Sequence, residues 1–453
     1  MKVLLIRPKP EKSTIGLQHV MICEPLELEY LVSNIPEELK GSVQAKIYDY
    51  ILEKKPFLEV IENEKPNFVV FTGYITHVET IKKMAHSIKE IDSSILTGVG
   101  GVHAEVVGVD FQDDALDFIY EKNGVDGFNR TLKGIINKES IDSIKDEIKL
   151  LERKEFNFNL IHPDRSSVKE YRSKYYYMFH NPCALIKTSY GCPYNCSFCF
   201  CKEITKGKYF SRDMKDVVEE IQSIKEDEIY IVDDDFLFGR EKLKEFISLL
   251  QEGNIKKNFL VYGRADFIAY NEDLIIEFKR VGLRAVIVGI ESIRDKDLTD
   301  YNKKTDVEIN EKCIKILKKH DIELYATLIL PMDFSKSDFK RLTNWLRALD
   351  VTFVNLQPLT PLPGTDIFED YEDKLLVGRD QYHLFDMAHV VLKPQLMSVR
   401  EFYIQILKSY YRIIIRPKHI LRLIKKYGVK ENMKMLKGSQ LVSYQYIMKI
   451  IRG

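Results

Sequence analysis

Short apolar runs alternate with segments of helical spacing along most of the chain, and this alternation restricts the fold more than any other feature. In the N-terminal third, runs typical of buried strands occupy residues 3–6, 42–47, 67–72, 94–98 and 116–120. Strands that alternate with helices form parallel sheets with helices packed against their faces. The sequence therefore predicts an N-terminal doubly wound α/β domain, whose ligands would bind beyond the carboxyl ends of the strands.

Glycines gather at those predicted strand ends. They are Gly73, Gly98, Gly100, Gly101 and Gly124. Glycine allows a backbone to approach a bulky ligand closely, and it is equally common in ordinary turns. No G-x-G-x-x-G follows the first strand, so the pattern is not that of a dinucleotide site. The residues alone leave a ligand cradle and a set of turns as two open interpretations.

Six further strand patterns, separated by helical ones, fill the middle of the chain. They cover residues 184–189, 228–236, 259–266, 285–292, 324–332 and 353–364. Six β/α units form a partial barrel, in which functional residues lie at the carboxyl ends of the strands. Polar residues recur at these ends: Asp233, Asp234, Asp235, Arg264, Asp266, Glu291 and Ser292. A run of three acids can also be a helix cap, but the recurrence on successive strands favours a site.

The segment GCPYNCSFCF, residues 191–200, contains Cys192, Cys196 and Cys199 in the spacing C-x3-C-x2-C. A structural zinc site needs four ligands, often from two pairs of cysteines, and no second pair lies elsewhere in the chain. Cys201 follows at once, and we interpret it as a packing residue. Three thiolates suit a [4Fe–4S] cluster with one iron left free to bind something else. The spacing therefore predicts such a cluster.

The same segment resembles the signature of the radical S-adenosylmethionine (SAM) enzymes. In that family the free iron binds SAM, and cleavage of SAM yields a 5′-deoxyadenosyl radical. The resemblance implies SAM contacts for Phe198 at the adenine, Asp234 and Asp235 at the amino group, Arg264 at the carboxylate, and Glu291 and Ser292 of the GIES segment at the ribose. The acidic run reads DDDFLF, so the register of the amino-group motif is ambiguous by one residue. A structural ion pair is an equally good interpretation of Arg264.

Further segments resemble the cobalamin-binding radical SAM enzymes, in particular the group that contains the anaerobic magnesium-protoporphyrin ring cyclase and the hopanoid methylases. They are GLQHVMICEPLELEYL at 16–31, FTG at 71–73, GVGGVHAE at 98–105, PLTPLPGT at 358–365 and FDMAHVVLKP at 385–394. The resemblance implies a Rossmann-like cobalamin-binding domain at residues 1–140 and a linker at 141–180. A partial (β/α)6 radical SAM barrel would follow at 181–370, and a mostly helical, basic domain at 371–453.

The resemblance also implies which residues contact cobalamin. Those near the lower face of the corrin would be Thr72, Gly73 and Tyr74, and those near its nucleotide tail would be Gly100, Gly101, Val102, His103 and Gly124. Many cobalamin domains carry D-x-H-x-x-G, whose histidine ligates cobalt, and the chain has no such motif. His77 and His103 lie at strand ends outside that context, so we expect cobalamin to bind without a histidine ligand of that type. After the fifth strand the chain reads EKNGVDGF, which departs from the family's acidic segment.

The reaction that the resemblance implies is methylation of an unactivated carbon through methylcobalamin and a 5′-deoxyadenosyl radical. One alternative is a cobalamin-dependent cyclisation or ring rearrangement without methyl transfer; another is a methylthiotransferase. The substrate would be a small molecule, a lipid or a peptide, and the electron donor a reductase such as flavodoxin or ferredoxin. Candidate residues on the substrate side, each equally well a structural hydrogen-bonding residue, are Tyr190, Tyr262, Gln357, Asp386 and His389.

Charge is balanced over the whole chain but not along it. The sequence contains 68 Lys and Arg and 68 Asp and Glu, so its bulk charge predicts no nucleic-acid partner. Residues 408–453, however, hold twelve basic residues and one acid. This basic tail with helical apolar spacing predicts either peripheral contact with an anionic membrane or a helical cap with a solvated face. Pro417 predicts at least two helices within it.

The sequence favours a monomer in the cytoplasm, with the inner membrane surface as the second location. The opening MKVLLIRPKP has too short an apolar run for a signal peptide. No run approaches the roughly 18 apolar residues of a membrane span. Seven cysteines, four of them crowded together, do not suit a secreted disulfide framework.

Overall fold

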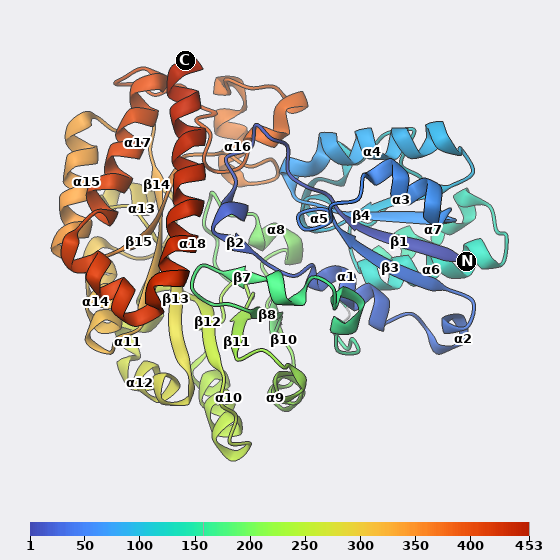
Figure 1. Ribbon diagram of the computed structural model, residues 1–453, viewed down its shortest axis with the longest axis horizontal. Helices are drawn as coiled ribbons and strands as arrows, with labels where there is room; N and C mark the ends of the chain where they lie inside the picture. The colour runs from blue at the N-terminus through green and yellow to red at the C-terminus, as the bar shows by residue number, and fades with distance from the viewer. Residues whose placement is uncertain (157, 453) are drawn as a thin grey trace. The chain divides into compact units, whose positions relative to one another are not determined.

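The computed structural model describes residues 1–156 and 158–452 (Figure 1). The chain forms two compact units, each with its own main sheet. The N-terminal unit comprises Met1–Thr14, Glu24–Lys174 and Gly378–Phe385. The barrel unit comprises Ile15–Cys23, Tyr175–Val377 and Asp386–Gly453.

The N-terminal unit is built on a five-stranded parallel sheet. Its strands are β1 (Lys2–Arg7), β3 (Gln44–Asp49), β4 (Phe68–Thr72), β5 (Leu96–Gly100) and β6 (Phe118–Ile119). They lie in the order β3-β1-β4-β5-β6, which is the doubly wound arrangement that the sequence predicts. The order reverses between β1 and β4, and ligands of such sheets bind at the carboxyl ends beside this reversal.

Helices cover this sheet because its central strands are apolar on both faces. Residues 3–6 and 68–71 are almost completely buried, which requires cover above and below. The helices of the unit are α1 (Leu26–Ser33), α2 (Glu37–Lys40), α3 (Phe57–Glu64), α4 (Val78–Ile91), α5 (Val102–Val107), α6 (Gly124–Ile136) and α7 (Ile141–Glu152). The ring of Phe68 packs against Phe118 of β6 and Phe128 of α6, with centroids 5.9 and 6.3 Å apart.

The barrel unit contains a six-stranded parallel sheet in the order β15-β14-β13-β12-β11-β8. Its strands are β8 (Cys183–Ile186), β11 (Glu228–Ile231), β12 (Asn258–Gly263), β13 (Leu283–Glu291), β14 (Glu323–Leu330) and β15 (Phe353–Pro358). The helices between them are α8 (Cys201–Thr205), α9 (Met214–Ser223), α10 (Arg240–Glu252), α11 (Ala265–Tyr270), α12 (Glu272–Val281), α13 (Asp295–Asp300), α14 (Val307–Lys319) and α15 (Lys336–Ala348). Each strand pairs with the next one along the chain, as predicted for a partial barrel of six β/α units.

The two faces of this sheet have different partners. Phe259 of β12 packs against Phe246 of α10 and Phe278 of α12, with centroids 5.6 and 5.8 Å apart. Its side of the sheet therefore faces the helices, and the alternate positions face the concave side of the barrel.

Tyrosines occupy that concave side. A short antiparallel pair, β2 (Met21–Ile22) and β7 (Tyr176–Tyr177), contributes one of them. The rings make a continuous row, the tyrosine column, in the order Tyr262, Tyr230, Tyr177 and Tyr325. Successive ring centroids are 6.0, 5.1 and 5.7 Å apart. The interior of the partial barrel is thus packed with side chains, as in closed barrels of this type.

The chain ends in helices. After α16 (Asp366–Tyr371) come α17 (Val399–Ile414) and α18 (Pro417–Arg452), which lie side by side (Figure 1). The break between them falls at Pro417, as predicted, and Gly428 interrupts α18 with a φ of 76°. Within the described part of the chain, no helix is long and apolar enough to cross a membrane.

Candidate active site

Strand β8 leads into the cysteine segment through a short strand, β9 (Ser189–Tyr190), which pairs with β10 (Phe210–Ser211). Asp233, just after β11, accepts hydrogen bonds from the backbone N–H groups of Thr188 and Ser189, at 2.7 and 3.0 Å, and from both hydroxyls. Asp234 accepts a hydrogen bond from the Gly191 N–H at 3.0 Å. Asp233 and Asp234 therefore hold the backbone at the start of the cysteine segment in place by hydrogen bonds.

Gly191 is required at the start of this segment. Its φ is +84°, a conformation that side chains disfavour. A Cβ atom there would also lie 2.2 Å from the Lys208 carbonyl oxygen. A larger residue would displace the turn that carries the cysteines.

Burial and a hydrogen bond set the acidity of the three predicted cluster ligands. Burial raises the pKa of the Cys192 thiol to about 12 and also raises the pKa of Cys196. The pKa of Cys199 is lowered, mainly because Cys201 donates a hydrogen bond to it. Among the residues that the structure describes, no three His, Cys, Asp or Glu side chains converge as a preformed metal site. Since metals bind cysteine as thiolate, cluster binding would release protons from Cys192 and Cys196.

Asp235 differs from its two neighbours because its carboxylate has no partner. Both oxygens are buried, and no described residue donates a hydrogen bond to them. Burial raises the pKa of this carboxyl to about 7, although the charges of Arg264 and Lys303 act against the rise. An unpartnered buried carboxylate is costly, and a bound cation relieves that cost. Asp235 therefore fits the ammonium group of SAM, and the geometry favours the register in which Asp235, rather than Asp234, meets it.

Glu291 lies at the end of β13, where the pairing with β14 shifts register and the residue has a φ of +61°. Such backbone strain in a non-glycine residue is concentrated at functional sites. The buried Glu291 carboxylate accepts a 2.9 Å hydrogen bond from the Lys303 ammonium group. Arg264 donates to the Lys303 carbonyl oxygen at 2.7 Å and pairs with Asp266 at 3.0 Å. The structural ion pair is thus present, and contact of Arg264 with the SAM carboxylate stays a prediction.

Phe198 lies beside the same lysine. Its ring meets Tyr301 edge-on, with centroids 5.6 Å apart, and the Lys303 ammonium lies 5.9 Å from its centre. The structure thus brings Phe198 and Glu291 together around Lys303. The predicted Ser292 is instead committed to Asp297, to which its hydroxyl donates a hydrogen bond.

Sequence reasoning missed Lys303 and Tyr301. They lie in the segment YNKKT, residues 301–305, which follows α13 and carries neither a recognisable motif nor a periodic pattern. The one available signal was a lysine twelve residues after Glu291, and such a spacing has no general meaning. Only the folded chain shows that this lysine is buried against the end of β13.

In the N-terminal unit, the residues predicted to contact cobalamin lie at the ends of β4 and β5. The Thr72 hydroxyl donates to Glu27 at 3.0 Å, and Tyr74 is 58% exposed. Gly101 has a φ of +101°, and a Cβ atom there would lie 2.9 Å from the Thr72 hydroxyl oxygen and 3.0 Å from the Gly73 carbonyl oxygen. The two strand ends are therefore in contact, beside the reversal of strand order where a ligand is expected.

The two histidines at these strand ends are already engaged. His103 Nε2 lies 2.9 Å from an Asp110 oxygen. His77 Nδ1 accepts the Tyr74 N–H at 3.2 Å, which leaves the ring hydrogen on Nε2. Burial lowers the pKa of His77 to about 4. The lone pair of His77 is therefore engaged, whereas in His103, among the described residues, only Nε2 faces a polar partner, the Asp110 carboxylate. That cobalamin binds without a histidine ligand stays a prediction.

Among the other predicted residues of this group, Gly124 leaves space beside its backbone. Gly100 ends β5, and Val102 begins α5. Gly124 begins α6, and no atom lies within 4 Å of the position that its Cβ would take. Open backbone at Gly124 and the exposed Tyr74 ring are compatible with a large ligand such as a corrinoid.

The candidate substrate-side residues have structural partners. Asp386 accepts the N–H groups of Ile15 and Ala388 at 2.6 and 2.9 Å, and His389 Nδ1 lies 2.8 Å from it. This pair is buried, so Asp386 fixes its own loop. Tyr262 belongs to the tyrosine column and is its most exposed member. Gln357 lies in β15 and Tyr190 in β9, and their contact with substrate stays a prediction.

Known proteins are similar to this chain in sequence. Residues 186–346 match the family model of the radical SAM superfamily. The chain is 26% identical to the hopanoid C-3 methylase of Methylococcus capsulatus, over 93% of this chain and 81% of the relative. It is 23% identical to the anaerobic magnesium-protoporphyrin IX monomethyl ester cyclase of Rubrivivax gelatinosus, over 79% of this chain and 67% of the relative.

A solved structure shares the fold. It is that of TsrM from Kitasatospora setae, a radical S-adenosylmethionine methyltransferase with cobalamin and a [4Fe–4S] cluster bound. The TM-score is 0.68 at 14% identity, over 99% of each chain. This likeness confirms the predicted α/β architecture with its helical C-terminal part. The chain therefore contains a domain of the radical SAM superfamily at residues 186–346, and the predicted resemblance to cobalamin-binding radical SAM enzymes is confirmed.

Proposed function

We propose that the chain is a cobalamin-dependent radical SAM C-methyltransferase that acts on an unactivated carbon. The observation that carries the proposal is the unpartnered, buried Asp235 carboxylate, which follows the two acids that fasten the three-cysteine segment. A buried carboxylate without a hydrogen-bond partner is stabilised by a cation, and SAM carries an ammonium group. The similarity to a hopanoid methylase supports methyl transfer as the outcome.

The residues of the barrel unit would bind and orient the cofactors. When bound, the cluster and SAM supply a hydrogen-abstracting radical, and cobalamin supplies the methyl group. Cys192, Cys196 and Cys199 would hold the cluster, and Asp235 would fix the amino end of SAM. Phe198 and Glu291 lie beside Lys303. The Phe198 ring would pack against the adenine of SAM, and the Glu291 carboxylate would accept hydrogen bonds from the ribose hydroxyls. Fixing SAM at both ends holds its reactive carbon in one position, which is the protein's main contribution to such chemistry.

The N-terminal unit would hold cobalamin. Thr72, Gly73 and Tyr74 would lie against the corrin, and the start of α5 and of α6 would meet its nucleotide tail; the residues there are Gly100, Gly101, Val102, His103 and Gly124. Because the chain has no D-x-H-x-x-G motif and the Nδ1 lone pair of His77 accepts the Tyr74 N–H, cobalamin would bind without a histidine ligand of that type.

A second candidate is a cobalamin-dependent cyclisation or ring rearrangement without methyl transfer. The similarity to the Rubrivivax gelatinosus cyclase supports it. The two reactions share the hydrogen abstraction and differ in the fate of the resulting carbon radical. They are separated by whether a methyl group from SAM reaches the product.

We further propose the domain limits 1–140, 141–180, 181–370 and 371–453 for the cobalamin, linker, barrel and C-terminal parts. The electron donor would be a flavodoxin or ferredoxin, because the cluster needs a one-electron reductant. The chain would act as a monomer on a small-molecule, lipid or peptide substrate. It would work in the cytoplasm and touch the inner membrane surface through its basic C-terminal part.

The test uses the full chain purified without oxygen. We expect about four irons and one corrinoid per chain, formation of 5′-deoxyadenosine from SAM under reducing conditions, and transfer of label from methyl-labelled SAM to the bound corrinoid. Cys196→Ala should lose the cluster and 5′-deoxyadenosine, whereas the matched Cys201→Ala should keep both. Absence of bound corrinoid would rule out the methylase and leave a plain radical SAM enzyme. Corrinoid that is bound but never labelled would favour the cyclase.

A further inference from the structure

Helix α18 carries a row of exposed apolar side chains. Its members are Val429, Met433, Leu436, Tyr444, Ile447 and Ile451, and each is between 39 and 68% exposed. Met433 and Tyr444 each lie two residues before a buried residue, Met435 and Tyr446. Two residues turn a helix by about 200°, so the row lies opposite the face that packs on the barrel unit. We call these six side chains the outer row.

The outer row is straight. Met433 and Leu436 are followed eleven residues later by Tyr444 and Ile447, and Val429 is followed by Ile451 after twice that distance. Eleven residues make almost three complete turns. The row therefore stays on one side of the helix for about 33 Å. A straight row suits a flat surface, whereas a left-handed pair of helices needs a seven-residue repeat.

Packing prevents α18 from turning this row inward. A Cβ atom at Gly438 would lie 2.1 Å from the His19 carbonyl oxygen, so helix and backbone are in close contact there. The Lys434 ammonium lies 3.4 Å from the centre of the Tyr176 ring. Tyr446 packs against Tyr403 and Tyr410, with centroids 6.1 and 6.2 Å apart. The face of α18 opposite the outer row is thus packed against the barrel unit.

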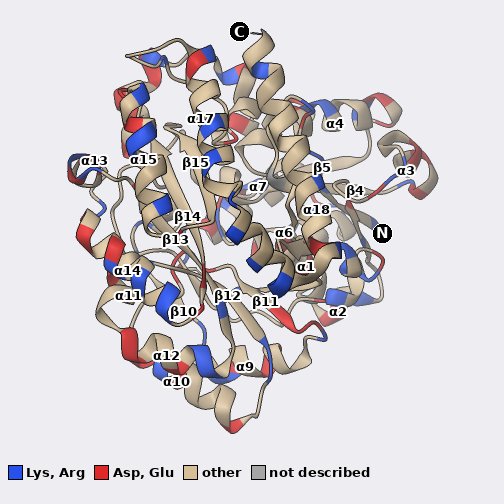
Figure 2. Ribbon diagram, turned by 60° about the vertical axis from the view of Figure 1, so that its left-hand side comes forward, with Lys and Arg blue, Asp and Glu red and all other residues tan. Residues whose placement is uncertain are grey.

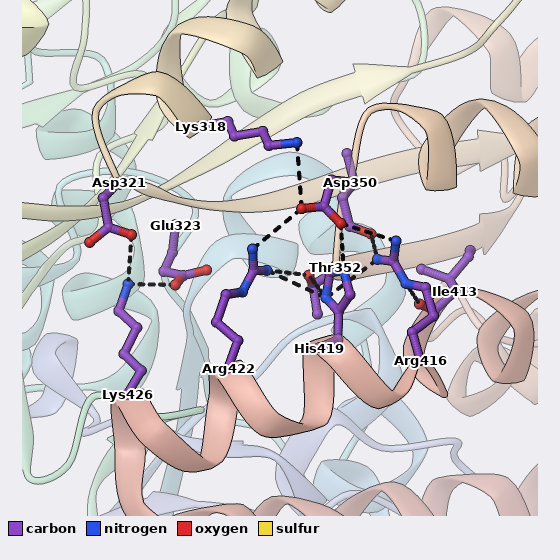
Figure 3. Close-up of polar contacts among 11 residues, drawn as sticks. Lys318, Asp321, Glu323, Asp350, Thr352, Ile413, Arg416, His419, Arg422 and Lys426 are labelled. Atoms are coloured by element: carbon purple, nitrogen blue, oxygen red, sulfur yellow. Dashed lines mark hydrogen bonds and ion pairs between the residues drawn. The ribbon is translucent and has the colours of Figure 1, made fainter.

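Ion pairs fix the part of α18 that precedes Gly428. Asp350 lies between Lys318 and the helix, and pairs with Arg416, His419 and Arg422 (Figure 3). Lys426 pairs with Asp321 and Glu323 one turn further along (Figure 3). These pairs hold the part of α18 before Gly428, whereas the contacts of Lys434, Gly438 and Tyr446 hold the part that carries the outer row.

Unpaired positive charge accompanies the outer row. Lys425, Lys430 and Lys437 are exposed and form no ion pair with any residue in the described part of the chain. Lys and Arg recur along α17 and α18, with little acidic colour between them (Figure 2). Residues 408–453 carry a net charge of +11. Two copies of this surface would repel each other, whereas an anionic surface would attract it.

We propose that α18 lies in the headgroup region of a bilayer that contains anionic phospholipids, with the outer row inserted at the boundary with the acyl chains. An exposed apolar row flanked by lysines is the composition of helices that lie in a membrane interface. The proposal deepens the membrane contact suggested above by naming the inserted residues and the lipid charge. It does not depend on the reaction that the barrel unit catalyses.

The test is flotation of the full-length, cluster-loaded chain with phosphatidylcholine vesicles, with and without phosphatidylglycerol. We expect binding to the anionic vesicles only, weakened by salt. Lys430→Gln with Lys437→Gln should weaken binding roughly 25-fold, since each lysine near such a surface contributes about 1 kcal/mol. Met433→Ser with Ile447→Ser should abolish flotation. The matched control is Leu150→Ser on α7, which removes a 57% exposed leucine outside α18 and should change nothing.

Two results would overturn the proposal. One is equal flotation of the Met433→Ser, Ile447→Ser variant and the unsubstituted chain. The other is a dimer, seen by light scattering, that this variant converts to a monomer, because the outer row would then bind a second copy. Thermal unfolding of each variant shows that loss of binding is not loss of fold. The assay uses no substrate, so its failure leaves the proposed methyl transfer intact, and failure of the labelling experiment leaves this surface intact.

Discussion

Replacing Asp235 by asparagine should affect stability and SAM binding in opposite directions. In the folded chain without SAM, burial raises the pKa of this carboxyl from 3.8 to about 7. The folded state then holds a proton that the unfolded state has released, so stability falls as pH rises from about 4 to 7 and stays low above 7. The shift corresponds to about 4 kcal/mol at pH 8 and to less than half of that at pH 5.

Asparagine has nearly the same shape and no titratable proton. Asp235→Asn should therefore gain stability relative to the unsubstituted chain, and the gain should grow by about 3 kcal/mol between pH 5 and pH 8. Denaturant unfolding of the cluster-free chain at several pH values measures this difference. At the same time the variant loses the counter-charge of the SAM ammonium, so the cluster-loaded form should bind SAM at least tenfold more weakly by calorimetry, because charge-assisted hydrogen bonds are the strong ones.

Asp234→Asn is the matched control, because Asp234 already has a backbone donor and can keep it through the amide oxygen. It should show neither the pH-dependent gain in stability nor a comparable loss of SAM affinity. The reasoning would be refuted by an Asp235→Asn variant that binds SAM as tightly as the unsubstituted chain. It would also be refuted if the stability difference between them did not change with pH.

Three further substitutions test other parts of the structure. Gly191→Ala should lose most of the cluster in iron analysis, because its Cβ would meet the Lys208 carbonyl oxygen at 2.2 Å; a full iron content would contradict this. Asp350→Asn should cost about 1–3 kcal/mol locally, because it leaves Arg416, His419 and Arg422 without their carboxylate partner. Hydrogen exchange should then quicken in residues 417–427 and not in α6. Phe259→Ala should lower the free energy of unfolding by about 3–5 kcal/mol, measured by denaturation, since its ring fills the space between α10 and α12.

Much of the architecture followed from the alternation of apolar runs, because local patterns decide which segments become strands and helices. The position of the strand-order reversal, between β1 and β4, did not, since it depends on which strands pair in the folded unit. In the candidate active site, the three cluster cysteines could be predicted from the sequence because their spacing is local. The different roles of Asp233, Asp234 and Asp235 could not be predicted, because they depend on which carboxylate accepts hydrogen bonds from the N–H groups that follow β8. Lys303 contacts Glu291 only through tertiary packing, so no local sequence pattern could predict this contact.

The tyrosine column has a consequence for turnover. Tyr262 is 36% exposed, whereas Tyr230 and Tyr325 are 6% and 5% exposed, so solvent reaches the column at Tyr262, near the carboxyl end of β12. A reactant that enters at the strand ends has no second exit through the sheet. Product and spent cofactor would therefore leave on the side of the carboxyl ends, where substrate also enters. Exchange of reactants rather than chemistry can then limit the rate.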